Sequence, residues 1–411
     1  MPRADRHDQS AERRRGSSRR QFLVGGAVAG LGAAAAIGGD LLLQRGLTPA
    51  SAPMDALNGA EVVPFYGEHQ AGIDTAAQAH AQFIALDLHD GVDRAGLRRL
   101  MRILTDDAAR LTQGRAALAD MEPELALVPA RLTVTFGFGP GFVARAGGVG
   151  PSWVRPLPQF PIDRLDERWS DGDLLIQIAS DDPLTVAHAA RMLLKDSRSF
   201  ASVRWSQGGF RRAYGSERPG TTMRNLFGQV DGTSNPQPGT PEFDAVVWSG
   251  DGWLAGGTGV VVRRIRMDLE GWDRLDRTGR EQAVGRTLSN GAPLTGVDEY
   301  DEPDLDAVTP IGFPVIPEFS HLRRARSADG SPEIFRRSYN YDEAPSRDAI
   351  SDSGLIFVSY QADVERQFVP VQQRLAELDL LNEWTSPIGS AVFAIPPGCR
   401  EGGYIGETLL G

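Results

Sequence analysis

Residues 131–138 (RLTVTFGF) and 173–180 (DLLIQIAS) decide the fold of this chain. The first stretch alternates apolar and polar side chains with a period of two, which predicts a half-buried strand, and the second predicts another strand. Residues 82–88 (QFIALDL) and 201–208 predict two more strands, one before and one after this pair.

Helical segments separate these strands. Apolar residues recur at helical spacing through residues 93–118, and Asp182 can cap a helix that runs through Lys195. The resulting order, βαββαβ, is that of a ferredoxin-like unit.

The second half of the chain shows a similar α+β pattern less regularly. It predicts strand, helix, strand, helix and strand at residues 259–267, 275–285, 355–361, 364–380 and 390–395. Pro370 lies inside the last helix and predicts either a kink or a later start. Residues 289–347 form a long irregular insert rich in Asp, Pro, Gly and Arg, and an insert of this length favours a functional role.

Composition excludes several classes of site. The 411 residues allow two or three domains or one large double unit. The formal net charge of −11 does not fit a nucleic-acid-binding protein, because such proteins are usually basic. Because Cys399 is the single cysteine, an intramolecular disulfide, a cysteine-rich zinc site, a cysteine-ligated iron–sulfur cluster and covalently attached haem are excluded. Six histidines then supply nearly all the nitrogen ligands for a transition metal.

The first 52 residues predict an export signal. Arg19-Arg20-Gln21-Phe22-Leu23 precedes an uncharged run rich in Gly and Ala, a layout that points to the twin-arginine route. An A-x-A site ends at Ala52, although an uncleaved anchor stays open. The mature halves are then residues 53–225 and 226–411, and the expected location is extracellular, cell-envelope or periplasmic. Twin-arginine export carries folded proteins, often with a cofactor.

His321 stands out among the histidines by its setting, because Arg323, Arg324 and Arg326 follow it closely. Arginine binds carboxylates bidentately, so this cluster suits an anionic cofactor. Haem b carries two propionates and an iron that takes a proximal histidine. A solvated, Arg-rich loop is the alternative, and the residues alone leave both open.

A second candidate site lies in residues 227–236 (FGQVDGTSNP), where Gly228 and Gly232 bracket Asp231. Glycine permits a positive φ or a close approach of the backbone to a flat ligand. The alternative is an ordinary turn in which the Asp231 side chain is the cap.

These motifs, taken together, resemble the dye-decolorizing peroxidases. The resemblance rests on G-x-x-D-G at residues 228–232, H-x-R-R-A at 321–325, R-R-x-Y-x-Y at 336–341 and G-L-I-F at 354–357. Residues 63–67 (VPFYG) and 393–398 (FAIPPG) also look like that family, so the resemblance covers residues 60–411. Twin-arginine export fits its secreted bacterial branch, which includes deferrochelatase/peroxidase proteins. The resemblance implies an α+β fold of two ferredoxin-like (βαββαβ) units that form a dimeric α+β barrel-like fold within one chain.

The resemblance also implies roles for individual residues. His321 is the expected proximal ligand of one non-covalent haem b, Asp231 the distal acid/base, and Arg336 the distal arginine that stabilises O–O heterolysis. The other expected haem-pocket residues are Gly232, Thr233, Ser234, Leu355, Phe357 and Arg326. The neighbours of Arg326, Ser327 and Ala328, depart from the family pattern.

The implied function is a haem b peroxidase that reduces hydrogen peroxide and oxidises dyes, phenols or other one-electron donors. One alternative is a deferrochelatase of an iron-uptake system, which uses the same residues to release iron from haem. Another is a ferredoxin-like dimeric binding domain without haem. The expected partners are peroxide, a reducing substrate and the twin-arginine translocase, without nucleic acid, while iron-uptake partners and a homo-oligomer stay open.

Overall fold

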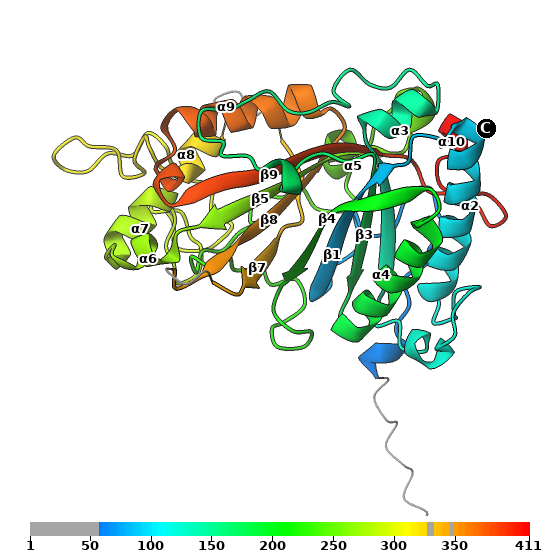
Figure 1. Cartoon of the computed structure of the whole chain (residues 1–411). Coiled ribbons are helices and arrows are strands. Elements are labelled where there is room, and N and C mark those ends of the chain that lie inside the picture. The colour runs from blue at the N-terminus through cyan, green and yellow to red at the C-terminus, as the bar shows by residue number, and fades with distance from the viewer. Residues whose placement is uncertain (1–56, 327–332, 346–348) are drawn as a thin grey trace, which may run out of the picture. The chain divides into compact units, whose positions relative to one another are not determined.

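The computed structural model describes residues 57–326, 333–345 and 349–411 (Figure 1). The leader predicted at residues 1–52 lies outside the described residues and stays a prediction. Within the described part of the chain, no helix is both long and apolar enough to cross a membrane.

The first half has the predicted βαββαβ order. Its elements are β1 (His80–Leu88), α2 (Arg94–Leu111), β2 (Thr133–Phe138), β3 (Leu174–Ser180), α4 (Pro183–Ser197) and β4 (Ala201–Phe210). Asp182 caps α4 as predicted, since its side chain accepts a hydrogen bond from the backbone N–H of Leu184 at 3.0 Å. Helix α2 ends earlier than predicted, and Gly114 follows with a φ of +68°. The four strands lie in the order β4-β1-β3-β2.

The second half repeats this strand order as β9-β5-β8-β7. Its elements are β5 (Thr258–Met267), α6 (Leu269–Asp273), α7 (Arg277–Val284), α8 (His321–Ala325), β6 (Phe335–Arg336), β7 (Tyr339–Glu343), β8 (Asp352–Gln361), α9 (Val369–Leu378) and β9 (Thr385–Ile395). Pro370 lies in the first turn of α9, after a π-helical turn (Val364–Phe368), so the predicted later start is confirmed. The other α-helices of the described residues are α3 (Pro140–Arg145), α5 (Pro241–Val247) and α10 (Glu407–Leu410).

The irregular insert predicted at residues 289–347 is not wholly irregular. It contains α8 and the short strands β6 and β7, which supply the second strand position of this half. These strands escaped prediction because they are two and five residues long, and two acidic residues end the longer one.

The two sheets join at both edges into a closed antiparallel barrel of eight strands. One junction is the pair Phe138↔Ala394 between β2 and β9, and the other is Phe210↔Asn340 between β4 and β7. Strand β6 pairs with β8 beside β7. The α+β fold of two ferredoxin-like units is therefore confirmed.

In the closed barrel, β1 is buried on both faces. In β1, Ile84 and Leu86 pack in the cluster that includes the α2 and α4 side chains, whereas Phe83 and Ala85 belong to the cluster that links the two sheets. Figure 1 shows α2 and α4 side by side over the first sheet and α9 over the second.

The half-buried character predicted for residues 131–138 is wrong, because all of β2 is buried. Its polar positions are satisfied inside the protein. Thr133 accepts a hydrogen bond from Gln78, and Thr135 donates one to the carbonyl of Ala71 at 2.6 Å. Alternate residues of β2 therefore face two different buried environments, rather than the core on one side and water on the other.

Gly354 provides a test of the packing between β5, β7 and β8. A Cβ at this position would lie 2.0 Å from the Ile265 carbonyl oxygen and 2.7 Å from the Tyr341 ring. Gly354→Ala should therefore lower the free energy of unfolding by about 1–3 kcal/mol, measured by chemical denaturation. The control is Gly250→Ala, where a Cβ meets nothing within 4 Å. Equal stability of the two variants would contradict this packing.

Candidate functional site

A cavity of about 540 Å³ lies mainly within the second half of the chain. This volume falls in the range of roughly 300–1,000 Å³ that is usual for small-molecule and cofactor sites. All the residues that the sequence assigned to the site line it: Asp231, Gly232, Thr233, Ser234, His321, Arg326, Arg336, Leu355 and Phe357.

His321 begins the short helix α8 and is oriented by a carboxylate. Its Nδ1 lies 2.6 Å from Oδ2 of Asp379, a residue 6% exposed whose other oxygen accepts the backbone N–H of Leu381. Since an ionised carboxylate only accepts, Nδ1 is the donor and Nε2 is left without a proton when the ring is neutral. Burial lowers the pKa of His321, but the charge and hydrogen bond of Asp379 outweigh that effect and raise it overall.

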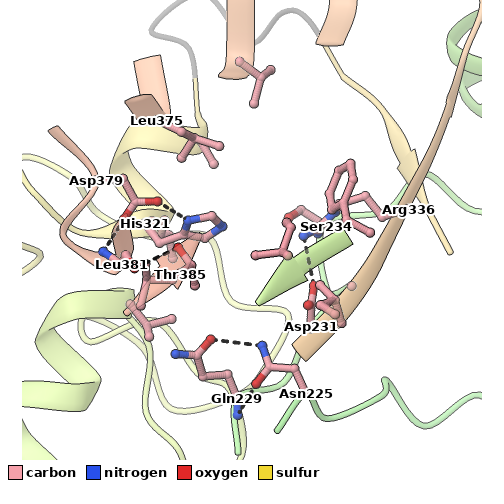
Figure 2. Close-up of a pocket in the computed structure, with 18 of the residues that line it drawn as sticks. Asn225, Gln229, Asp231, Ser234, His321, Arg336, Leu375, Asp379, Leu381 and Thr385 are labelled. Carbon is pink, nitrogen blue, oxygen red and sulfur yellow. Dashed lines mark hydrogen bonds and ion pairs between the residues drawn. The ribbon is translucent and has the colours of Figure 1, made fainter. Parts of the chain in front are cut away.

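Asp231 and Arg336 form a second polar pair of the cavity. Nη1 of Arg336 donates to Oδ1 of Asp231 at 3.1 Å. Figure 2 shows this pair on one side of the cavity and His321 with Asp379 on the other. The cavity therefore sets a carboxylate and a guanidinium opposite an imidazole.

Asn235, in the loop that follows Asp231, binds the backbone of Arg336. Its Nδ2 donates to the carbonyl oxygen of Arg336 at 2.7 Å, and its Oδ1 accepts the Arg336 backbone N–H at 3.1 Å. The carboxamide thus pairs with the edge of β6 that faces away from β8. Pro236 restricts Asn235 to extended conformations that suit this pairing.

The loop around Asp231 has the backbone that its glycines allow. Gly228 and Gly232 adopt φ values of +80° and +132°. Beyond Gly232, the Thr233 hydroxyl donates to Glu299 at 3.0 Å. The Asp231 side chain pairs with Arg336, so the alternative in which it only caps a turn does not describe this loop.

Leu355 and Phe357 reach the cavity from β8 because residues two apart on a strand face the same side. The sequence predicted that the arginines after His321 form one cluster for an anionic cofactor, but two of them lie outside the cavity. Arg323 donates to the carbonyls of Leu305 and Ile316, and Arg324 binds Glu377 and the carbonyl of Arg374, so neither lines the cavity.

Arg326 does line the cavity, where it forms an ion pair with Glu302. Two further residues of the site escaped sequence reasoning. Asp379 lies 58 residues beyond His321, and no spacing signal connects them. Arg286 follows a predicted helix end and carries no motif of its own, yet it also lines the cavity.

Two family models match consecutive parts of the chain. The model described as "Dyp-type peroxidase, N-terminal" matches residues 70–211, and "Dyp-type peroxidase, C-terminal" matches residues 222–400. Together they span both halves of the barrel.

Relatives and solved structures agree with these matches. The chain is 36% identical to a dye-decolorizing peroxidase of Thermobifida fusca, over 97% of this chain and 98% of that protein. It is also 36% identical to a deferrochelatase of Escherichia coli K12, over 88% of this chain and 90% of that protein.

Among solved structures, a DyP-type peroxidase from Cellulomonas bogoriensis is 55% identical, with a TM-score of 0.84 over 86% of this chain and 99% of that chain. Ferric DtpA from Streptomyces lividans is 40% identical, with a TM-score of 0.83 over 87% of this chain and 100% of that chain.

The two hydrogen bonds between the Asn235 carboxamide and the Arg336 backbone predict protection of the Arg336 amide from hydrogen exchange. Asn235→Ala removes the acceptor of the Arg336 N–H, so hydrogen exchange of that amide should become roughly tenfold faster. Asn235→Asp retains an acceptor and should keep most of the protection. The neighbouring Arg337 amide, which donates to the Val358 carbonyl, is the internal control. Unchanged exchange of the Arg336 amide in Asn235→Ala would show that its hydrogen bond to Asn235 does not form.

Proposed function

The chain belongs to the DyP-type peroxidase family and is a haem peroxidase, and from this membership we propose that its cavity holds haem b with His321 as the iron ligand. The observation that carries the proposal is the opposition of two polar pairs across one cavity, His321 with Asp379 and Asp231 with Arg336.

The donor set of the cavity fits this group. When its ring is neutral, His321 presents an unprotonated Nε2 because Asp379 engages Nδ1, which is the usual arrangement for a metal-binding histidine. The cavity also has apolar walls suited to a porphyrin, including Leu355, Phe357 and Leu375. When bound, haem supplies a redox-active iron and a conjugated ring for the reaction with peroxide.

Asp231 is proposed as the acid/base. Its carboxylate takes the proton from one peroxide oxygen and returns it to the other, which leaves as water. Peroxide is small enough to reach Asp231 inside the cavity, whereas larger reducing substrates deliver single electrons in later steps.

Arg336 is proposed to stabilise the negative charge that develops on the departing oxygen. Its hydrogen bond to Asp231 holds the guanidinium, and Asn235 holds the Arg336 backbone, before the reaction, so little reorganisation is needed. Asp379 acts through His321, since its hydrogen bond fixes the ring orientation and increases the basicity of Nε2.

One observation favours a second function, iron release from haem: the similarity to relatives named deferrochelatase. The same cavity would bind haem, and the products would be iron and an intact metal-free porphyrin. Porphyrin fluorescence after incubation with haem and a reductant would support this function over the peroxidase alone.

Export by the twin-arginine route is also a proposal, supported by Arg19-Arg20 and the uncharged run that follows. Lysine at both Arg19 and Arg20 should keep the protein in the cytoplasm. Cell fractionation would show where it accumulates.

The assignment of the iron ligand predicts the behaviour of His321→Ala. The Soret band should disappear or shift, and added imidazole should restore it by occupying the vacated position. Optical titration of the purified protein with haem provides the measurement. His89→Ala, which changes an exposed histidine, is the matched control. An unchanged spectrum in His321→Ala would place the ligand elsewhere.

The proposed distal roles predict a kinetic change without haem loss. Asp231→Asn and Arg336→Leu should each slow the absorbance change that follows mixing with peroxide by roughly 10²–10³-fold, in stopped-flow experiments. Arg274→Leu, which breaks an exposed ion pair with Glu270, is the control. Wild-type rates in both cavity variants would refute the assigned roles.

A further inference from the structure

Asp231 lies at the end of a short hairpin. Arg224 and Val230 pair across its two arms in an antiparallel bridge, and the backbone N–H of Asp231 donates to the carbonyl of Met223 at 2.8 Å. Gly232 then leaves the hairpin with a φ of +132°. Among the described residues, no backbone hydrogen bond joins the two arms beyond this point. The position of Asp231 therefore depends on what holds the open end of the hairpin.

The side chain of Glu299 bridges this open end. Its Oε1 accepts hydrogen bonds from the hydroxyl of Thr222 at 2.6 Å and from the hydroxyl of Thr233 at 3.0 Å. Thr222 directly precedes the first arm, and Thr233 lies two residues after Asp231. A Cβ on Gly232 would lie 3.3 Å from Cγ2 of Thr222, so the two arms are close here. A single carboxylate oxygen thus links the arms where the backbone does not.

The chemistry of these groups fixes the direction of the hydrogen bonds. A hydroxyl has one hydrogen and an ionised carboxylate only accepts, so Thr222 and Thr233 both donate to Glu299. The hydroxyl of Tyr300, 3.2 Å from that of Thr222, is then the donor of the bond between them. Hydrogen bonds to a charged acceptor are stronger than those between neutral groups. The bridge therefore resists separation of the arms more than two neutral contacts would.

Glu299 is itself held through its backbone. Its carbonyl oxygen accepts Nη1 of Arg286 at 2.9 Å, and the same Nη1 donates to the carbonyl of Gly291 at 2.7 Å. Glu299 does not line the cavity, whereas Asp231 and Thr233 do. The Glu299 carboxylate therefore affects the cavity through the hairpin and not by contact with a ligand.

We propose that Glu299 is a positioning residue, which holds Asp231 where its carboxylate exchanges protons with peroxide. This inference rests on the proposed role of Asp231 as the acid/base. Proton transfer needs the carboxylate within hydrogen-bond distance of the peroxide oxygens, and a displacement of about 1 Å can lower a rate roughly 10²-fold. Arg336 restrains the Asp231 side chain, and the Glu299 bridge restrains the backbone on both sides of it.

Stopped-flow mixing of the haem-loaded protein with peroxide tests the bridge. Glu299→Ala removes the shared acceptor and should slow the reaction about ten- to a hundredfold, with the Soret band retained. Glu299→Gln keeps an oxygen that accepts both hydroxyls, so its rate should stay within about threefold of the wild type. Thr222→Val removes one of the two bonds with a smaller change, and should slow the reaction about three- to tenfold.

A double-mutant cycle separates the positioning of Asp231 from general loosening of the loop. In Asp231→Asn the carboxylate no longer exchanges the proton, so adding Glu299→Ala should slow the reaction further by less than about threefold. Asp301→Ala is the matched control, because the Asp301 carboxylate accepts the backbone N–H groups of Val297 and Asp298 in the same loop. Among the described residues it makes no hydrogen bond to the hairpin, so this variant should react at the wild-type rate.

Three results would contradict the inference. Wild-type rates in Glu299→Ala, beside a slow Asp231→Asn, would show that the bridge does not position the carboxylate. Effects that multiply in the double variant would show that Glu299 acts independently of Asp231. An equal loss of rate in Asp301→Ala would assign the effect to the loop as a whole. If Asp231→Asn itself reacts at the wild-type rate, the proposed function fails, which is distinguishable because that variant leaves Glu299 in place.

Discussion

The pairing of β5 with both β8 and β9 is the constraint on which the rest of the site depends. Strand β5 pairs with β8 from Gly259↔Gln361 to Met267↔Ser353, and with β9 over a similar length. Strand β8 in turn positions Leu355, Phe357 and, through the Arg336↔Ser359 pair, Arg336. Helix α9, between β8 and β9, brings Asp379 to His321. Residues far apart in the chain thus meet around one cavity because three long strands pair along their length, with one register shift between β5 and β9 at Arg264 and Ile265.

Within that frame, the site depends on hydrogen bonds that orient charged groups. Asp379 orients the imidazole, and Asn235 and Asp231 hold the backbone and side chain of Arg336. Each contact immobilises a group before any ligand arrives, so the groups act as preorganised dipoles and charges. Arg286 is oriented in a similar way, since the backbone carbonyls of Gly291 and Glu299 accept hydrogen bonds from its Nη1.

The sequence predicted much of the fold and the principal residues of the site. The first βαββαβ unit was predictable because its strands are long and its helices are capped and amphipathic. Strands β6 and β7 were not, because strands of two and five residues carry too little periodicity. The site motifs could be named from resemblance, but Asp379 and Arg286 could not. Their positions depend on the meeting of segments that no local pattern connects. The arginines after His321 misled for the opposite reason, because proximity in sequence did not bring Arg323 and Arg324 into the cavity.

In the proposed function, haem lies between His321 and the Asp231–Arg336 pair. A crystal structure of the protein purified with haem tests it most directly. We expect iron bonded to Nε2 of His321, with Nδ1 still bound to Asp379 and with Asp231 and Arg336 over the opposite face of the ring. Iron bonded to another residue, or Asp231 and Arg336 on the same face as the ligand, would contradict it.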